Sequence, residues 1–178
     1  MSMWETQGVK RKVFISFYHK DDQYYRNRFS ELFGHMIINC SVDEGEINSD
    51  NSSEYIKRLI QKDYINNASV VIVLIGPNTK NRKHVDWEIS AALNKKVGGY
   101  SGLIGLLLPS HPNYHTEGFD TSYIPSRLAD NVNSGYAKIY NWTDDSIAMA
   151  RRIDMAFSAR IDSADKINNS RIQMARNL

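Results

Sequence analysis

Short apolar runs alternate with amphipathic stretches along most of this chain. Five runs have the length and the β-branched, aliphatic or aromatic content of strands, and they cover residues 13–17, 37–42, 69–75, 103–108 and 137–140. The run over residues 69–75 is almost wholly apolar, which is typical of a central parallel strand covered on both faces. The pattern therefore predicts a sheet of about five strands.

Amphipathic stretches between these runs predict helices. Tyr25, Phe29 and Leu32 lie at helical spacing after the first run, where Asp21 or Asp22 can cap a helix that Gly34 ends. Further helices are predicted from Ser52 or Ser53 to residue 65, over residues 87–93 and from residue 143 to about residue 162.

Alternating strands and helices favour parallel pairing, because each parallel neighbour needs a crossover connection. We expect an α/β, flavodoxin-like, doubly wound parallel sheet with strand order 2-1-3-4-5. The predicted domain covers residues 10–142, and residues 143–178 add a C-terminal helical extension packed on it or projecting from it. Residues 164–178 contain few large apolar side chains and are expected to be a solvated extension or an arm for another subunit.

Ligands of such sheets bind outside the carboxyl ends of the strands, where the strand order reverses. This rule groups several candidate residues at one edge: Tyr18, His19 and Lys20; Asp43 and Glu44; Asn78 and Thr79; and His111. Asp43 and Glu44 could contact ribose hydroxyls, although acidic residues in a polar loop are more often simply solvated. A single histidine in a loop is likewise more often structural than catalytic.

Glu88 follows this third group and lies near the start of a predicted helix. A carboxylate there could stabilise the positive charge that develops on a sugar when an N-glycosidic bond breaks. On pattern alone, the commoner interpretation is a carboxylate that stabilises a helix N-terminus. Trp87 could stack on a base or pack in the core, and at helical spacing it points to a different face from Glu88.

Composition excludes several classes of protein. The formal charge of +2 is too small to attract nucleic acid or an anionic membrane, and Cys40, the only cysteine, can form neither an internal disulfide nor a cysteine cage for a metal. The longest apolar run is too short to span a bilayer and the N-terminus lacks a signal-peptide core, so a cytoplasmic location is expected. Glycine-rich nucleotide loops and a serine-hydrolase elbow are absent, and the scattered histidines predict no metal site.

Three separated segments resemble the TIR-like family. Residues 12–18, KVFISFY, are similar to its opening strand, and residues 81–93, NRKHVDWEISAAL, to its catalytic helix. Residues 125–142 resemble the distal pattern of the bacterial subgroup that includes the TIR proteins of Thoeris antiphage systems. Trp87 and Glu88 are adjacent, whereas many TIR enzymes place a serine or cysteine before the glutamate at a longer spacing from the tryptophan.

The resemblance implies an enzyme that cleaves NAD+ and makes a cyclic ADP-ribose isomer or a related signal for a separate effector. It implies that Glu88 is catalytic and that Phe17, Tyr18 and His19 border the nicotinamide side. Asp43, Glu44, Asn78 and Trp87 complete the predicted NAD+ site, and no cofactor beyond the substrate is expected. We expect little activity before infection, a segment over residues 110–135 that covers the pocket, and the capacity to form homo-oligomers. The alternative is a non-catalytic TIR-like module that binds nucleotides or proteins.

Overall fold

A five-stranded, wholly parallel sheet forms the centre of the computed structural model, which describes residues 9–41 and 62–178. The strand order is β2-β1-β3-β4-β5, as the sequence predicted. The strands are β1 (Arg11–Ser16), β2 (Ile37–Asn39), β3 (Val70–Ile75), β4 (Gly102–Leu107) and β5 (Lys138–Asn141). The chain therefore has the α/β architecture expected of a TIR-like domain.

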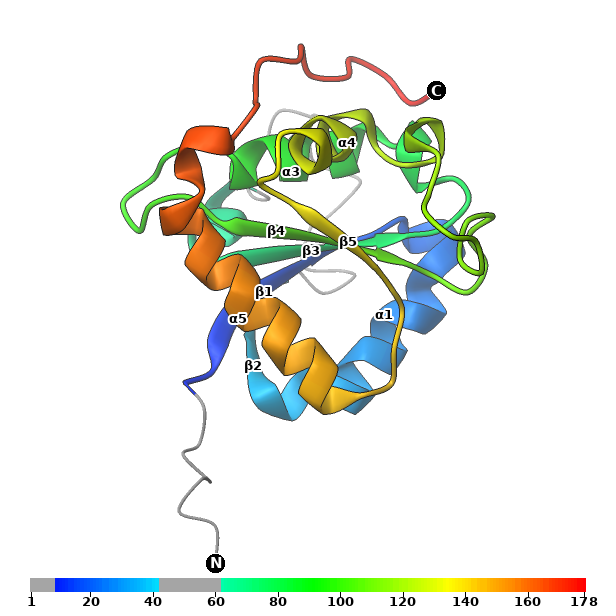
Figure 1. Cartoon of the computed structure of the whole chain (residues 1–178), viewed down its shortest axis with the longest axis horizontal. Helices are drawn as coiled ribbons and strands as arrows, with labels where there is room; N and C mark the ends of the chain where they lie inside the picture. The colour runs from blue at the N-terminus through cyan, green and yellow to red at the C-terminus, as the bar shows by residue number, and fades with distance from the viewer. Residues whose placement is uncertain (1–8, 42–61) are drawn as a thin grey trace, which may run out of the picture.

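Helices cover both faces of the sheet (Figure 1). They include α1 (His19–Phe33), α3 (Lys83–Ala92), α4 (Ser126–Asn133) and α5 (Ser146–Asp162), with short 3-10 helices at Gly34–Met36, Thr79–Asn81, Thr121–Tyr123 and Ala164–Lys166. In Figure 1, α1 and α5 lie on one side of the sheet and α3 and α4 on the other. This arrangement gives three layers, as right-handed crossovers between parallel strands require.

The central strand β3 contributes side chains to the two hydrophobic cores, one on each face of the sheet. Val71, Val73 and Ile75 pack into the core on the side of α3 and α4, whereas alternate residues such as Val70 and Ile72 pack on the side of α1 and α5. Every residue of β3 is buried. Its continuous apolar run is thus the consequence of two covered faces.

Helix α1 begins earlier than the sequence predicted. Tyr18 is its N-cap and makes no capping hydrogen bond through its side chain, so the prediction of a cap at Asp21 or Asp22 was wrong. Asp22 lies within the helix but has non-helical dihedrals (φ −120°, ψ 16°). The helix ends at Phe33, just before Gly34, as expected.

Helix α5 packs against the sheet at Gly102. A Cβ atom at this position would collide with the backbone of Ala156, so glycine permits the close approach of helix and strand. Asp145 caps the helix, and its carboxylate accepts a hydrogen bond from the N–H of Ile147 at 2.9 Å. Met149 and Ile153 anchor the helix in the core that it shares with α1.

The segment between β4 and β5 is partly helical. His111 is buried, its Nε2 lies 2.8 Å from the carbonyl of Tyr123, and its Nδ1 accepts a hydrogen bond from the N–H of Asn113. The ring therefore ties the start of this segment to its 3-10 helix, which makes His111 a structural residue.

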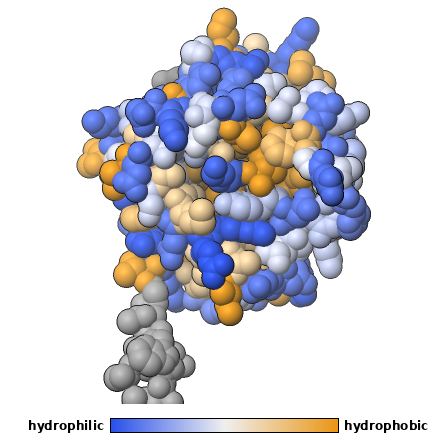
Figure 2. All heavy atoms as spheres, in the orientation of Figure 1, coloured by the Kyte–Doolittle hydropathy of each residue, from blue (hydrophilic) through white to orange (hydrophobic). Residues whose placement is uncertain are grey.

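The surface is mixed in character. Figure 2 shows mainly polar side chains on the face that it presents, with hydrophobic side chains gathered around the edge strand β5. Within residues 9–41 and 62–178, no helix combines the length and the apolar character needed to cross a bilayer.

Candidate active site

The carboxyl ends of β1 and β3 lie side by side where the strand order reverses. Ser16 at the end of β1 pairs in register with Val73 of β3. Beyond this point the backbone leads from β1 into α1 and from β3 toward α3. This reversal is the usual ligand site of doubly wound sheets. Helix α3 places Glu88 near this reversal, next to Ser16 at the end of β1.

Glu88 is the most strongly perturbed acid at this edge. Its side chain is buried, with 5 % of its surface exposed. Burial raises its pKa from 4.5 to about 8, and the nearby Ser16 hydroxyl partly counters this rise. At neutral pH the group is therefore mainly protonated, and a cationic ligand beside it would favour the carboxylate form.

The residues after β1 form a small aromatic group. Phe17 is buried, and its ring stacks on that of the exposed His19 with centroids 4.1 Å apart and an interplanar angle of 27°. Tyr18 is partly exposed, and the guanidinium of Arg82 lies 4.2 Å from its ring centroid. Because Arg82 immediately precedes α3, this cation–π contact joins the loop after β1 to the helix that carries Glu88.

A second polar link joins the loops after β1 and β3. Asn78 donates from its side-chain amide to the carboxylate of Asp21 at 2.8 Å. Asp22 is buried against Gly76, and the hydroxyl of Thr79 lies 3.5 Å from its carboxylate. The sequence identified these acids only as helix caps; their position beside residues 76–79 became visible only in the fold.

Burial also perturbs Asp22. Desolvation, followed by the negative charge of Asp21, raises its pKa from 3.8 to about 6, while the hydrogen bond from Thr79 lowers it. The same edge of the sheet thus holds two acids, Asp22 and Glu88, whose protonated forms are favoured by their surroundings. Titratable groups of this kind are concentrated at functional sites.

The remaining predicted residues do not all join this group. Asp43 and Glu44 lie outside the described residues. Trp87 is buried on another face of α3, where its indole nitrogen donates to the carbonyl of Met174 at 2.9 Å. Its polar group is therefore committed to the C-terminal segment of the chain.

The chemistry of this edge suits the stabilisation of a transient cation. A carboxylate in a water-poor environment interacts strongly with positive charge, and aromatic rings can border a planar group. In the part of the chain that the structure describes, no three or more His, Cys, Asp or Glu residues lie together as ligands for a metal ion.

Comparison with known proteins finds one matching family model, that of the TIR-like domain of the Thoeris protein ThsB, over residues 14–113. The match begins in β1, ends in the loop after β4 and includes Glu88. No curated protein matches the chain.

Two solved structures are similar in outline. One is described as the activated Roq1 resistosome directly recognizing the pathogen effector XopQ (TIR domains), with 13% identity, a TM-score of 0.44 and coverage of 88% of this chain and 84% of that one. The other is FerB, a flavoenzyme NAD(P)H:(acceptor) oxidoreductase from Paracoccus denitrificans, with 11% identity, a TM-score of 0.45 and coverage of 88% and 98%.

Proposed function

This chain belongs to the family of TIR-like domains of the Thoeris protein ThsB, and we propose that it cleaves NAD+ at the bond between nicotinamide and ribose. The ADP-ribosyl group would close on itself to give a cyclic isomer, or form a related conjugate, which then acts on a separate effector protein. NAD+ is the substrate, and the reaction needs no other cofactor.

The observation that carries this proposal is the burial of Glu88 at the strand-order reversal, with its pKa raised to about 8. An ionised group is costly to bury, so burial favours the neutral form of a carboxyl group. Such a group can ionise when a cationic substrate arrives. That behaviour is typical of active sites.

The proposed reaction uses the charge already present on the substrate. The bond from C1′ of the ribose to the nicotinamide nitrogen breaks, and its electron pair leaves with nicotinamide, which becomes neutral. The carboxylate of Glu88 stabilises the positive charge that develops on the ribose. A nucleophilic atom of the same ADP-ribose then bonds to C1′ and loses a proton, whereas attack by water would give free ADP-ribose.

The residues after β1 and β3 have supporting roles in this proposal. Tyr18 and His19 border the nicotinamide, and Phe17 supports the ring of His19 from below. Asn78, beside Asp21, shapes the entrance after β3. Asp43 and Glu44, outside the described residues, are proposed to contact the ribose hydroxyls of the adenosine.

One observation favours a second candidate function, a TIR-like module that binds a nucleotide or protein without cleaving it. Only 5 % of the Glu88 surface is exposed, so this conformation gives a substrate little access to the carboxyl group. An enzyme with this site must open before it turns over, and such an enzyme is expected to have low activity before infection. A binding module would have no such requirement.

The test is to incubate the purified protein with NAD+, alone and with lysate from phage-infected cells, and to follow nicotinamide and ADP-ribose products by mass spectrometry. Glu88→Gln should lower turnover by at least about 100-fold, the usual loss when a key electrostatic group is removed. Glu31→Gln is the matched control, because Glu31 is an exposed residue on α1 in a surface ion pair with Arg28. Absence of products under both conditions, with NAD+ still bound, would favour the binding module.

A further inference from the structure

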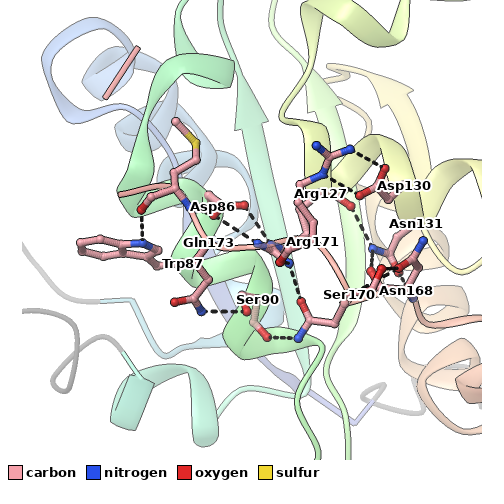
Figure 3. Close-up of polar contacts among 12 residues, drawn as sticks. Asp86, Trp87, Ser90, Arg127, Asp130, Asn131, Asn168, Ser170, Arg171 and Gln173 are labelled. Carbon is pink, nitrogen blue, oxygen red and sulfur yellow. Dashed lines mark hydrogen bonds and ion pairs between the residues drawn. The ribbon is translucent and has the colours of Figure 1, made fainter. Parts of the chain in front are cut away.

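Residues 167–178, called the strap below, cross the outer side of α3 and α4 (Figure 1). The strap contains no helix or strand. Two of its large apolar side chains, Ile172 and Leu178, are 91% and 79% exposed, and Ile167 at its start packs against the core beneath α3 and α4. Hydrogen bonds along its length hold it in place (Figure 3).

The middle of the strap is bound to α3 through both the backbone and a side chain. The N–H of Met174 donates to the Asp86 carboxylate at 2.8 Å, and its carbonyl accepts from the Trp87 indole at 2.9 Å. The side-chain amide of Gln173 donates to the hydroxyl of Ser90 at 3.0 Å. The strap thus holds three α3 residues that lie within little more than one helical turn.

The end of the strap caps the N-terminus of α3. No side-chain hydrogen bond from Arg82, the N-cap residue, satisfies the first N–H groups of this helix. Instead, the side-chain oxygen of Asn177 accepts from the N–H of Lys83 at 2.9 Å, and the N–H of Leu178 donates to the carbonyl of Asn81 at 3.0 Å. An asparagine oxygen is a favourable partner at a helix start, even though this one comes from a distant part of the sequence.

A buried arginine anchors the start of the strap. Arg127 of α4 is fully buried; its Nε and Nη2 donate to the Asp86 carboxylate at 2.9 and 3.3 Å. Its Nη1 donates to the Asn169 side chain and to the carbonyl of Arg171. Arg127 therefore fixes α3, α4 and the strap to one another (Figure 3).

The strap and Glu88 lie on different faces of α3. At about 100° per residue, Asp86 and Ser90 are each roughly 160° around the helix from Glu88. Val85 and Ile89 pack into the core beneath the helix, and Glu88 interacts with Ser16 of β1. The strap therefore cannot reach a substrate at Glu88 and can influence it only through the position of the helix.

We propose that the strap positions Glu88 by clamping α3 against the sheet, with Gln173, Met174 and Asn177 as positioning residues. The catalytic consequence rests on the proposed NAD+ cleavage, whereas the effect on the placement of Glu88 does not. When these contacts are lost, α3 can move outward, water reaches Glu88 and the proposed transition-state geometry is lost.

The decisive experiment compares full-length variants. Gln173→Ala combined with Asn177→Ala removes two side-chain contacts to α3, and Gln173→Ala with Asn177→Asp restores an acceptor for the N–H of Lys83. Arg171→Ala is the matched control, because it breaks the side-chain contact of the strap with Asp130 of α4 and leaves those to α3. Each variant is titrated by NMR with ¹³C-labelled glutamate, and the Glu88 signal is assigned by its loss in Glu88→Gln.

The double alanine variant should lower the pKa of Glu88 by at least one unit from about 8, and the aspartate variant should return it most of the way. Arg171→Ala should leave it unchanged. In the NAD+ assay, kcat of the double alanine variant should fall at least tenfold while KM changes little, because the strap does not contact substrate.

An unchanged Glu88 titration in a folded double variant would overturn the positioning role. Single variants supply the same comparison if the double variant fails to fold. A wild-type protein without turnover would count against the proposed function alone, because the titration does not depend on it.

Discussion

Two carboxylates two residues apart on α3 are buried to the same degree but in contrasting surroundings. Asp86 is 4% exposed and lies between the Arg127 guanidinium, at 2.9 Å, and the N–H of Met174. Glu88 is 5% exposed and lies on the opposite side of the helix near Ser16, where burial raises its pKa to about 8. The first is held by specific polar partners of the structural framework, and the second is the acid whose neutral form is favoured by burial.

Burial alone therefore does not identify a functional acid. A buried carboxylate with a guanidinium and a backbone N–H as partners has its oxygens satisfied by charge-assisted hydrogen bonds. A carboxyl group whose surroundings favour the neutral form can change its charge when a ligand approaches. Substitutions on the two faces of α3 are therefore expected to change the stability of the protein in different ways.

The largest expected effect comes from removing the partner of Asp86. Arg127→Met should lower the free energy of unfolding by about 3–5 kcal/mol, because it leaves a buried carboxylate without its guanidinium. Urea unfolding at pH 7 measures the change. Arg171→Met, which removes an ion pair with a more exposed arginine, should cost no more than about 1 kcal/mol. Similar losses of stability in both variants would mean that the buried Arg127–Asp86 pair contributes no more than the exposed Arg171–Asp130 pair.

Glu88→Gln should have the opposite effect on stability. The folded-state pKa of Glu88 lies above its unfolded value, so the folded protein binds this proton more tightly and the wild type loses stability as pH rises from about 4.5 to about 8. Glutamine does not titrate, so the variant should exceed the wild type by up to about 5 kcal/mol at pH 9, at roughly 1.4 kcal/mol for each pKa unit, with the excess declining toward pH 4.

Urea unfolding of Glu88→Gln and the wild type at pH 4, 6, 8 and 9 checks this difference. Glu31→Gln provides the control, because Glu31 is exposed and its substitution should leave the pH profile unchanged. Parallel profiles for the wild type and Glu88→Gln would contradict a raised pKa at Glu88 and weaken its contrast with Asp86.

Asp22 provides an intermediate case. Its pKa is raised to about 6, so Asp22→Asn should stabilise the protein above pH 6 by about 1–2 kcal/mol and have little effect below pH 4. Thermal unfolding across this pH range measures the effect. Asp21→Asn sharpens the test, because it removes the neighbouring negative charge and should shift the transition of Asp22 to lower pH. A gain that is equally large at pH 4 would assign the effect to packing against Gly76.

The smallest effect is expected on the outer face of α3. Trp87→Phe preserves an aromatic ring but removes the indole donor to Met174, which should cost about 1 kcal/mol, the usual net contribution of one hydrogen bond. Equilibrium unfolding measures this loss, and hydrogen exchange at the N–H of Met174 shows whether the strap has loosened. A loss above about 3 kcal/mol would mean that the ring itself fills part of the core.

Sequence patterns predicted most of the fold because strands and helices leave periodic traces. The apolar run around β3 and the glycine after α1 identified their elements within a residue or two. The start of α1 was misplaced because Asp21 and Asp22 have the composition of a cap, while their side chains are used by the loop after β3. Such a contact joins residues more than fifty positions apart and has no local signature.

The candidate site was only partly predictable. Tyr18, His19, Asn78 and Glu88 follow predicted strands closely enough to be grouped at one edge, and resemblance to a family favoured a catalytic role for Glu88 over that of an ordinary helix-start acid. Nothing in the local pattern indicated that Asp22 is buried, or that Trp87 binds the strap. The polar, apolar-poor composition of residues 164–178 suggested a solvated extension or an arm for another subunit, whereas the strap binds α3 and α4 of its own chain.

The parallel sheet and its strand order were predictable from the sequence, because they follow from periodicity and the handedness of crossovers. Which of two neighbouring carboxylates pairs with an arginine, and which has a raised pKa, depended on the folded structure. Burial and partners belong to the assembled fold, and Arg127, forty-one residues from Asp86 along the chain, meets it only there.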